Sequence, residues 1–367
     1  MKKAILFVDD DDNIIKGLKR IMRAKRSKWD MFFVESGEAA LRILSQTSIA
    51  VIVADIRMPG MDGVELLHKI RGYYPQVIRI VLSGHSSREN NLRLAKLAHQ
   101  YFTKPCDIND LKNCIEYFCS LEERFLKKNK EVAKVINSIQ VLPILPGLHD
   151  LLVRELKSPV ASLKKISGIV AQDILMSAKI LQLANSAFFA LDQKTAFPDQ
   201  AVTILGLEFI KELVLGAKIF SSFPENPNHE GFFLYQLWKH SMMVGTAAKE
   251  IALNEPSGVK FADEAFVAGM LHDVGKILLR EVPGFFQQFR EFICEKRCSH
   301  LAAEKELLGV THAGAGAYFL GLWNIPDDIV EAVAYHHCPG KVEERRFSVL
   351  TCLHAANGLI DRGEGVS

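Results

Sequence analysis

Short apolar runs, separated by amphipathic stretches, dominate residues 1–122 of the chain. Four of the runs have the length and the β-branched, apolar composition of buried parallel strands. They cover residues 4–8, 51–54, 77–82 and 101–103. From residue 110 onward the apolar spacing becomes helical, and beyond residues 142–147 one helical pattern follows another without a convincing alternating strand. The pattern therefore predicts an α/β domain followed by an all-α domain.

Polar residues mark where several helices begin. Asp11 is expected to cap the first helix and Asp12 to supply an acid to its first turn. In the second domain, Ser158 and Pro159 are predicted to begin one helix, with serine as the cap and proline in the first turn. Asp199 is predicted to begin another.

Charged and hydroxyl side chains stand where the predicted strands end. Asp9 and Asp10 follow the first strand, Asp55 the second, Ser83 the third and Lys104 the fourth. Parallel strands end at one edge of a sheet, so these side chains are expected to lie together. Clustered carboxylates require a hard divalent cation to offset their repulsion, and Mg²⁺ is the natural candidate. A metal ion, a hydroxyl and an ammonium around one aspartate suit phosphoryl transfer to that carboxylate.

Residues 1–122 resemble a two-component receiver domain. The acidic pair, the spacing from Asp55 to Pro59 and Gly63, and the pair Lys104 and Pro105 occur in the order of that family. Any one of these residues alone would be an ordinary strand, turn or cap residue. The resemblance implies a flavodoxin-like fold, with a parallel, five-stranded, doubly wound sheet. It also implies the following roles: phosphoacceptor Asp55; Mg²⁺ ligands Asp9, Asp10, Asp55 and the backbone carbonyl of Arg57; phosphoryl contacts Ser83 and Lys104; and a rotamer switch at Tyr101.

A helical stripe follows the receiver-like segment and predicts one long continuous helix. Its apolar positions are Leu111, Ile115, Phe118, Phe125, Val132, Ile136 and Ile139. Glu122 and Asn129 fall on the same seam, where a polar residue can set the register of a coiled coil. We expect residues 123–141 to join the domains and to pair with a second subunit in a homodimer. The alternative is that the stripe packs against the chain's own second domain.

Histidines gather in the second half of the chain where helices are predicted to end. They are His240, His272, His312, the pair His336 and His337, and His354. Asp273 follows His272 directly, and Lys276 lies one turn later. An adjacent His and Asp at a helix end can ligate one metal, while a nearby lysine can pair with a phosphate.

This part of the chain resembles the HD superfamily of metal-dependent phosphohydrolases. As a whole, residues 142–367 resemble its HDOD branch, a helical output domain. The resemblance rests on five phrases at residues 142–146, 183–186, 237–241, 268–273 and 323–337.

The pattern of the related HD-GYP hydrolases is only partly present. It matches at His240, His272, Asp273, Lys276, His312, His336 and His337. Two carboxylate positions hold amides instead, Gln236 and Asn357, and the Gly-Tyr-Pro segment expected after His337 is replaced by Cys-Pro-Gly. Losing two anionic ligands is expected to weaken multinuclear metal binding and the catalysis that depends on it. Two possibilities stay open: a single transition metal (Mn, Fe, Zn or Ni) on histidines and Asp273, or a metal-free core in which Asp273 and the amides hydrogen-bond the imidazoles.

Composition narrows the class of protein. The chain has 367 residues, 49% of them hydrophobic, which is enough for two cores. The net charge of +2 and the absence of a basic helix-turn-helix disfavour nucleic-acid binding. The sequence shows neither a signal peptide nor a run of about eighteen apolar residues that could span a membrane. The seven cysteines form no zinc-type pairs, so we expect reduced thiols and a cytoplasmic protein.

Together these features predict a response regulator. A sensor histidine kinase or another phosphodonor would phosphorylate Asp55, Ser83 would move toward the phosphoryl group, and Tyr101 would move inward. The sheet face that carries the long helix would change with them, and the HDOD domain would respond by binding an unknown protein effector. The alternative is a receiver-gated, metal-dependent phosphodiesterase or phosphohydrolase.

Overall fold

The computed structural model describes nine stretches of the chain. They are residues 2–84, 97–127, 129–139, 142–144, 146–186, 194–216, 220–222, 230–343 and 346–363. The chain divides into two compact units. One is built mainly from Met1–Arg124 and Ala133–Gln140, and the other from Phe125–Val132, Val141–Asn185 and Leu191–Ser367.

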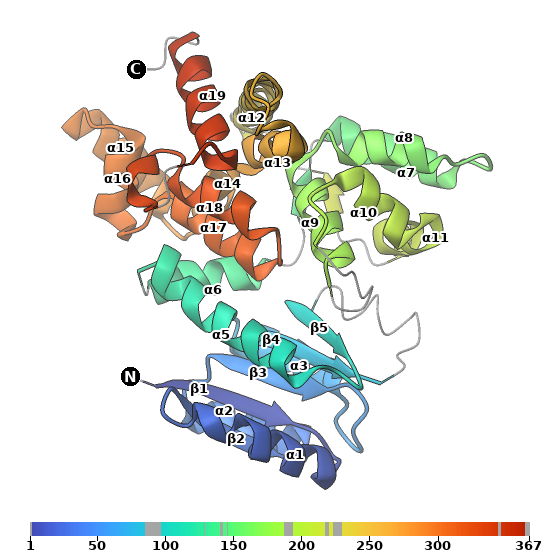
Figure 1. Cartoon of the computed structure of the whole chain (residues 1–367). Coiled ribbons are helices and arrows are strands. Elements are labelled where there is room, and N and C mark those ends of the chain that lie inside the picture. Colours follow the sequence, from blue (N-terminus) through green and yellow to red (C-terminus); the bar gives the residue numbers. More distant parts are fainter. Residues whose placement is uncertain are drawn as a thin grey trace. The chain divides into compact units, whose positions relative to one another are not determined.

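The first unit contains a five-stranded, all-parallel sheet in the order β2-β1-β3-β4-β5 (Figure 1). Its strands are β1 (Lys3–Val8), β2 (Trp29–Val34), β3 (Val51–Asp55), β4 (Ile78–Ser83) and β5 (Gln100–Thr103). The sheet confirms the flavodoxin-like prediction. The edge strand β2 was missed by the pattern of apolar runs, because most of its side chains are only half-buried.

Helices cover both faces of this sheet. They are α1 (Asp12–Met22), the 3₁₀ turn η1 (Arg23–Lys25), α2 (Gly37–Gln46), α3 (Gly63–Tyr73) and α5 (Ile108–Phe125). Apolar side chains of α2 and α3 form one core cluster with Leu6, Ile52 and Val81 of the strands. On the other face Phe7 stacks on Phe33, and α1 and α5 lie on that side (Figure 1). The layers follow from the alternation of side chains along each strand.

Local chemistry sets the turns that carry the carboxylates. The Asp11 side chain accepts a hydrogen bond from the backbone N–H of Asn13 at 2.8 Å, which confirms it as the cap of α1. After β3, the N–H of Gly63 donates to the carbonyl of Ile56 at 2.8 Å. A Cβ on Gly63 would lie 2.1 Å from the Asp55 carbonyl oxygen, so only glycine permits this closed turn beside Asp55.

The prediction of one continuous helix after the sheet is wrong. The chain forms α5 and then a separate helix, α6 (Lys130–Ser138). Lys127 adopts a left-handed conformation with φ of 47°, and the Asn129 side chain accepts from the N–H of Val132 at 3.1 Å. The asparagine therefore caps a new helix, and this local capping overrides the heptad-like spacing.

The apolar stripe along α5 and α6 is buried within a single chain. Leu111, Ile115 and Val132 are completely shielded from solvent. Glu122, one of the two polar residues on the seam, pairs with Lys3 at 3.0 Å instead. A coiled coil with a second subunit would have to expose these residues first, and the homodimer stays an untested prediction.

The second unit is helical. Its helices are α7 (Pro146–Lys157), α8 (Leu163–Val170), α9 (Ile174–Ala184), α10 (Pro198–Leu205), α11 (Leu207–Lys211), the π-helical turn η3 (Glu212–Gly216), α12 (Glu230–Leu253), η4 (Val259–Phe261), α13 (Ala262–Leu271), α14 (Val274–Arg280), α15 (Phe285–Lys296), α16 (His300–Leu308), α17 (His312–Leu322), α18 (Asp327–Tyr335), η5 (Pro339–Lys341) and α19 (Val349–Gly363). The all-α prediction is confirmed, apart from two short parallel strands that it missed, β6 (Leu142–Ile144) and β7 (Phe220–Ser222).

One helix start differs from the prediction. Ser158 and Pro159 lie in a turn after α7, and α8 begins only at Leu163. The Ser158 hydroxyl accepts from the N–H of Val160, which is a serine turn instead of a helix cap. Asp199 does lie in the first turn of α10, as expected.

The helices α14 and α17 cross closely beside the histidines of the second unit. A Cβ on Gly275 of α14 would lie 1.9 Å from the carbonyl oxygen of His312, at the start of α17. The missing side chain lets α14 and α17 approach each other, which brings Asp273 and His312 together. Among the described residues no single helix meets the length and hydropathy needed to cross a membrane, and α8 with α9 meets them only as a pair bent by 120°.

Candidate functional site

Three carboxylates converge at the carboxyl ends of β1 and β3. Candidate ligand oxygens of Asp9, Asp10 and Asp55 all lie within 4.8 Å of one another. Asp9 and Asp55 are buried, while Asp10 is exposed. The structure thus brings together the three carboxylates that the sequence predicted, in a cluster suited to a hard divalent cation.

Lys104 completes this cluster from the end of β5. Its Nζ lies 2.7 Å from Asp9 Oδ2 and 3.0 Å from Asp55 Oδ2. Burial opposes the charged form of Lys104, but its hydrogen bonds to the two carboxylates outweigh burial and raise its pKa. Burial also raises the pKa of Asp9, against the hydrogen bonds from Lys104 and from the Asp11 N–H. The lysine therefore supplies fixed positive charge where a phosphoryl group would develop negative charge.

The remaining predicted receiver residues are placed less completely. Asp55 Oδ1 accepts from the N–H of Ile56 at 2.7 Å, which orients its carboxylate. Arg57 lies in the turn that follows, and its carbonyl as a metal ligand stays a prediction. Tyr101 packs against the core cluster of the sheet, and burial raises the pKa of its hydroxyl. Ser83 ends β4, but its side chain lies outside the described residues.

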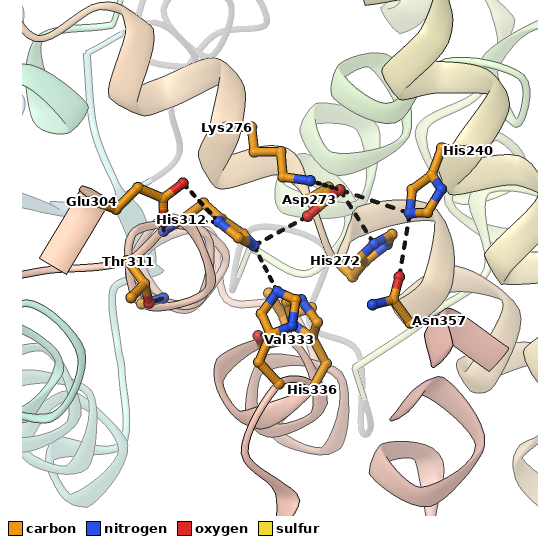
Figure 2. A network of polar contacts seen from close by, with 12 residues as sticks. His240, His272, Asp273, Lys276, Glu304, Thr311, His312, Val333, His336 and Asn357 are labelled. Atoms are coloured by element: carbon orange, nitrogen blue, oxygen red, sulfur yellow. Dashed lines mark hydrogen bonds and ion pairs between the residues drawn. The ribbon is translucent and has the colours of Figure 1, made fainter. Parts of the chain in front are cut away.

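A second site forms in the helical unit, where side chains from several helices point toward one another (Figure 2). His240 comes from α12, His272 and Asp273 from the junction of α13 and α14, and His312 from the start of α17. The other contributors are His336 and His337, which follow α18, and Asn357 on α19. Residues separated by more than a hundred positions thus lie close together, as the partial match to the HD-GYP pattern predicted.

Helix ends orient two of these imidazoles. His272 and His336 stand at the carboxyl ends of α13 and α18, and each donates its Nδ1–H to a carbonyl three residues earlier. The acceptors are Gly269, at 2.6 Å, and Val333, at 2.8 Å. These carbonyls belong to the last helical turn, which leaves them without a helical partner. The bonds fix each ring so that Nε2, with its lone pair, is directed away from its own helix.

Three buried acceptors in this centre have no hydrogen-bond partner among the described residues. They are His272 Nε2, His336 Nε2 and Asp273 Oδ1. Asp273 Oδ1 does lie 3.3 Å from His312 Nε2, but without hydrogen-bond geometry. Buried polar atoms are nearly always paired, so three unpaired acceptors in one centre need an explanation. Two groups of side chains in this centre have ligand atoms within 4.8 Å of one another and could hold a metal ion: His240, His272 and Asp273, and His312, His336 and His337.

The charge on Asp273 is stabilised by its neighbours. Lys276 Nζ lies 2.6 Å from Asp273 Oδ2. Burial alone would favour the neutral acid, but His272 and Lys276 outweigh it and hold the pKa of Asp273 well below its usual value. Burial lowers the pKa of His336, and it lowers that of His337 to about 3 with help from His312. The lowered pKa values of His336 and His337 favour their neutral forms, which is the protonation state that a metal ligand requires.

The two amide positions behave differently. Asn357 donates from Nδ2 to Asp361 Oδ2 at 3.1 Å, so its oxygen faces His240 Nε2, at 3.2 Å. His240 thus donates Nε2–H to an amide, and it also belongs to a group of candidate metal ligands with His272 and Asp273. Gln236 is exposed on α12, outside the network in Figure 2. His354 is turned to the carbonyl of His336, at 2.6 Å, and does not line the centre.

Two acidic residues of this site were not predicted from the sequence. Glu304 on α16 is buried and contacts the His312 ring through both oxygens, at 2.9 Å. Asp361, one turn after Asn357, has a carboxylate oxygen 3.9 Å from His240 Nε2. The only signal for Glu304 in the sequence is a pair of leucines three and four residues later, which marks it as a charge on an otherwise apolar helix face.

The family model for the HDOD domain matches residues 142–339, more than half of the chain. The chain belongs to the HDOD family. A second family model, for the response regulator receiver domain, matches residues 5–116. The protein therefore combines an N-terminal receiver with a C-terminal HDOD domain, as the two sets of motifs predicted. A receiver implies a Mg²⁺ site and a phosphodonor partner.

The curated relatives share only parts of their length with this HDOD protein. An uncharacterized protein of Treponema pallidum is 24% identical over 212 residues, 57% of this chain and 40% of the relative. The hydrogenase transcriptional regulatory protein HoxA of Cupriavidus necator is 33% identical over 103 residues, 28% of this chain and 21% of HoxA. The DNA-binding transcriptional regulator NtrC of Salmonella typhimurium is 32% identical over 135 residues, 36% of this chain and 28% of NtrC. The chain thus spans less than half the length of each.

Solved structures resemble the HDOD protein in fold alone. The MmoQ response regulator from Methylococcus capsulatus is 20% identical with a TM-score of 0.49, over 60% of this chain and 86% of that one. An HDOD domain protein with unknown function from Geobacter sulfurreducens is 22% identical with a TM-score of 0.38, over 65% of this chain and 79% of that one.

Replacing Lys104 with methionine should tighten Mg²⁺ binding to the receiver. The change removes a positive charge from beside two carboxylates, and a unit charge about 5 Å from Mg²⁺ is worth roughly 1–2 kcal/mol even in water. We expect an affinity on the order of tenfold higher by calorimetric titration. Lys134→Met, an exposed change on α6, is the control and should bind Mg²⁺ as the wild type does. A weaker affinity for Lys104→Met would contradict this electrostatic account.

Proposed function

We propose that the protein is a response regulator in which phosphorylation of Asp55 controls the HDOD domain. Mg²⁺ would be held by Asp9, Asp10, Asp55 and the Arg57 carbonyl, with a sensor histidine kinase or another phosphodonor as the source of the phosphoryl group. The supporting observation is Lys104 between Asp9 and Asp55, 2.7 and 3.0 Å away. A fixed cation beside an oriented carboxylate stabilises the charge that develops during phosphoryl transfer.

The proposed domain boundaries are a receiver at residues 1–122, a connection at 123–141 and an HDOD output at 142–367. The family match ends at residue 339. The segment beyond it includes α19, and Asn357 of α19 bonds His240 of α12. This contact supports the inclusion of α19 in the output domain.

The HDOD domain would act by binding an effector without turnover. Hydrolysis in the HD superfamily requires metal ions joined by shared acidic ligands. In this chain two of the acidic ligand positions hold amides. Asn357 accepts the Nε2–H of His240 through its side-chain oxygen, and Gln236 is exposed. What remains is a set of imidazoles with the single carboxylate Asp273, which favours fewer ions than a set with shared acidic ligands.

We therefore include a single divalent transition metal (Mn, Fe, Zn or Ni) in the proposal. The three acceptors without a hydrogen-bond partner support it, because a cation could satisfy the lone pairs to which no described side chain or backbone group donates. Histidines of this centre and Asp273 would hold the ion, and it would supply Lewis acidity if a substrate reached it. A second candidate function, a receiver-gated phosphohydrolase, is favoured by the two groups of candidate metal ligands in this centre and by the nearby carboxylate of Asp361.

Phosphorylation should alter the full-length protein through Asp55 alone. Treated with acetyl phosphate and Mg²⁺, the wild type should gain one phosphoryl group by intact mass spectrometry, and its small-angle X-ray scattering profile should change. Asp55→Asn should show neither effect, because it lacks the acceptor carboxylate. Asp62→Asn is the matched control, since asparagine still caps α3 and Asp62 is exposed. A phosphorylated wild type that scatters like Asp55→Asn would refute control of the output domain.

Metal content and turnover separate the two candidate functions. Plasma mass spectrometry should find one transition metal per wild-type chain and none in His336→Ala, which loses an unpaired buried Nε2. His68→Ala, an exposed change on α3, should retain the metal. Neither cyclic di-GMP nor a generic phosphodiester should be hydrolysed with added Mn²⁺. Turnover that disappears in His336→Ala would make the protein a hydrolase.

A further inference from the structure

Glu304 contacts one imidazole of the HDOD centre, that of His312, at Nδ1. Asp273 lies near the opposite nitrogen of the same ring, Nε2. Glu304 is 3% exposed. Both of its oxygens lie 2.9 Å from His312 Nδ1, and Oε2 also accepts the backbone N–H of His312 at 2.8 Å. One buried carboxylate thus holds both the first residue of α17 and its ring (Figure 2). The anion also lies at the amino end of α17, where the helix dipole favours it.

This contact determines which nitrogen of His312 carries the proton. Because the carboxylate accepts from Nδ1, the lone pair is left on Nε2. His312 Nε2 lies 3.0 Å from His337 Nε2 and 3.3 Å from Asp273 Oδ1, so it is directed into the centre. His272 and His336 are oriented in the same way, but by neutral backbone carbonyls. His312 alone of the three is backed by a negative charge.

We propose that Glu304 is a positioning residue that makes His312 the strongest imidazole ligand of the proposed HDOD metal site. This inference rests on that metal site. A carboxylate behind a ligating imidazole holds the ring and raises its basicity, and the loss of such a partner costs about 10–100-fold in metal affinity. The competing account is that Glu304 only caps α17.

Glu304→Gln separates the two accounts, because glutamine keeps the size and an acceptor oxygen but removes the charge. Wild type, Glu304→Gln and Glu304→Ala would be titrated as full-length, metal-stripped proteins with Co²⁺, read by its visible absorption bands. Thermal unfolding of the metal-free forms would show which variants fold. The matched control is Glu306→Gln, an exposed change on the same helix.

We expect Glu304→Gln to fold and to bind Co²⁺ about 10–100-fold more weakly, with shifted absorption bands. Glu306→Gln should match the wild type. If the wild type binds Co²⁺ and Glu304→Gln binds it equally well with the same bands, the role of Glu304 is overturned while the metal site stands. If the wild type takes up no Co²⁺, the metal site is overturned, and the role of Glu304 with it.

A second, independent observation concerns Arg79, a buried arginine in β4. It is 3% exposed, and its guanidinium donates to backbone carbonyls. Nε donates to Leu97 at 2.6 Å, Nη1 to Val77 at 2.9 Å and Nη2 to Asn137 at 3.3 Å. An arginine is always charged, so burying it is tolerable only when its donors are filled in this way.

The acceptor Asn137 belongs to the last turn of α6, whose carbonyls lack helical partners. Its side chain is also tied down, because Nδ2 donates to the carbonyl of Gln76 at 3.3 Å. Two hydrogen bonds thus attach the end of α6 to the segment that enters β4.

Arg79 is also joined to the strand that carries Tyr101. Its N–H donates to His99 Nδ1 at 2.9 Å, and its carbonyl accepts the N–H of His99 at 2.8 Å. Two residues further along both strands, Val81 is paired with Tyr101. Alternate residues point to one face, so Arg79, His99 and Tyr101 share a face of the sheet.

We infer that Arg79 couples the β4–β5 edge of the receiver to the end of α6. Hydrogen exchange of the full-length protein tests this. In Arg79→Met, the amides of residues 133–138 should exchange at least tenfold faster, while those of α2 should not change. Arg42→Met, exposed on α2, is the matched control. Phosphorylation should speed exchange of α6 in the wild type and have no further effect in Arg79→Met.

Asn137→Ala is the control for a general loss of receiver structure, because it removes the hydrogen bond to Gln76 and leaves the Arg79 guanidinium in place. Exchange at 133–138 should rise while β4 stays protected. The coupling is overturned if α6 in both variants is as protected as in the wild type, or if phosphorylation speeds its exchange equally in Arg79→Met.

Discussion

Lys104 lies between two buried carboxylates that come from different strands, and the receiver site depends on this interaction. Asp9 and Asp55 would repel each other at neighbouring strand ends, where burial weakens the screening by water. One ammonium contacts both, while the backbone N–H groups of Asp11 and Ile56 take the other oxygens. These contacts stabilise the cluster. Each carboxylate oxygen keeps a further lone pair, so the cluster can still accept a cation or a phosphoryl group.

In the HDOD centre the charge of a buried carboxylate is also compensated, but by different contacts. Asp273 is compensated by Lys276, one turn later, so the ion pair is local to one helix start. The imidazoles around it are oriented from behind, by helix-end carbonyls for His272 and His336 and by Glu304 for His312. Held in this way, His272 Nε2 and His336 Nε2 have no hydrogen-bond partner among the described residues, whereas His312 Nε2 lies 3.0 Å from His337 Nε2.

Between the two sites, local chemistry decides the course of the chain. The apolar spacing continues from α5 into α6, yet Lys127 turns left-handed and Asn129 starts a new helix. The end of that helix is then bound by a buried charge, Arg79, that lies in a strand. The chain therefore passes from α5 to α6 through a break, and the end of α6 is held by hydrogen bonds to Arg79 and Gln76.

The sequence by itself determined the two fold classes, the receiver carboxylates and the histidine set. These signals are local or depend on residue type: apolar runs end in acids, and parallel strands bring their ends to one edge. Tertiary structure alone decided the diversion of His240 to Asn357 and the places of Glu304 and Arg79. Each of these depends on which long-range partner reaches a given polar atom, and no spacing along the chain records that choice. A buried glutamate and a buried arginine look like surface residues until the fold supplies the atoms that they contact.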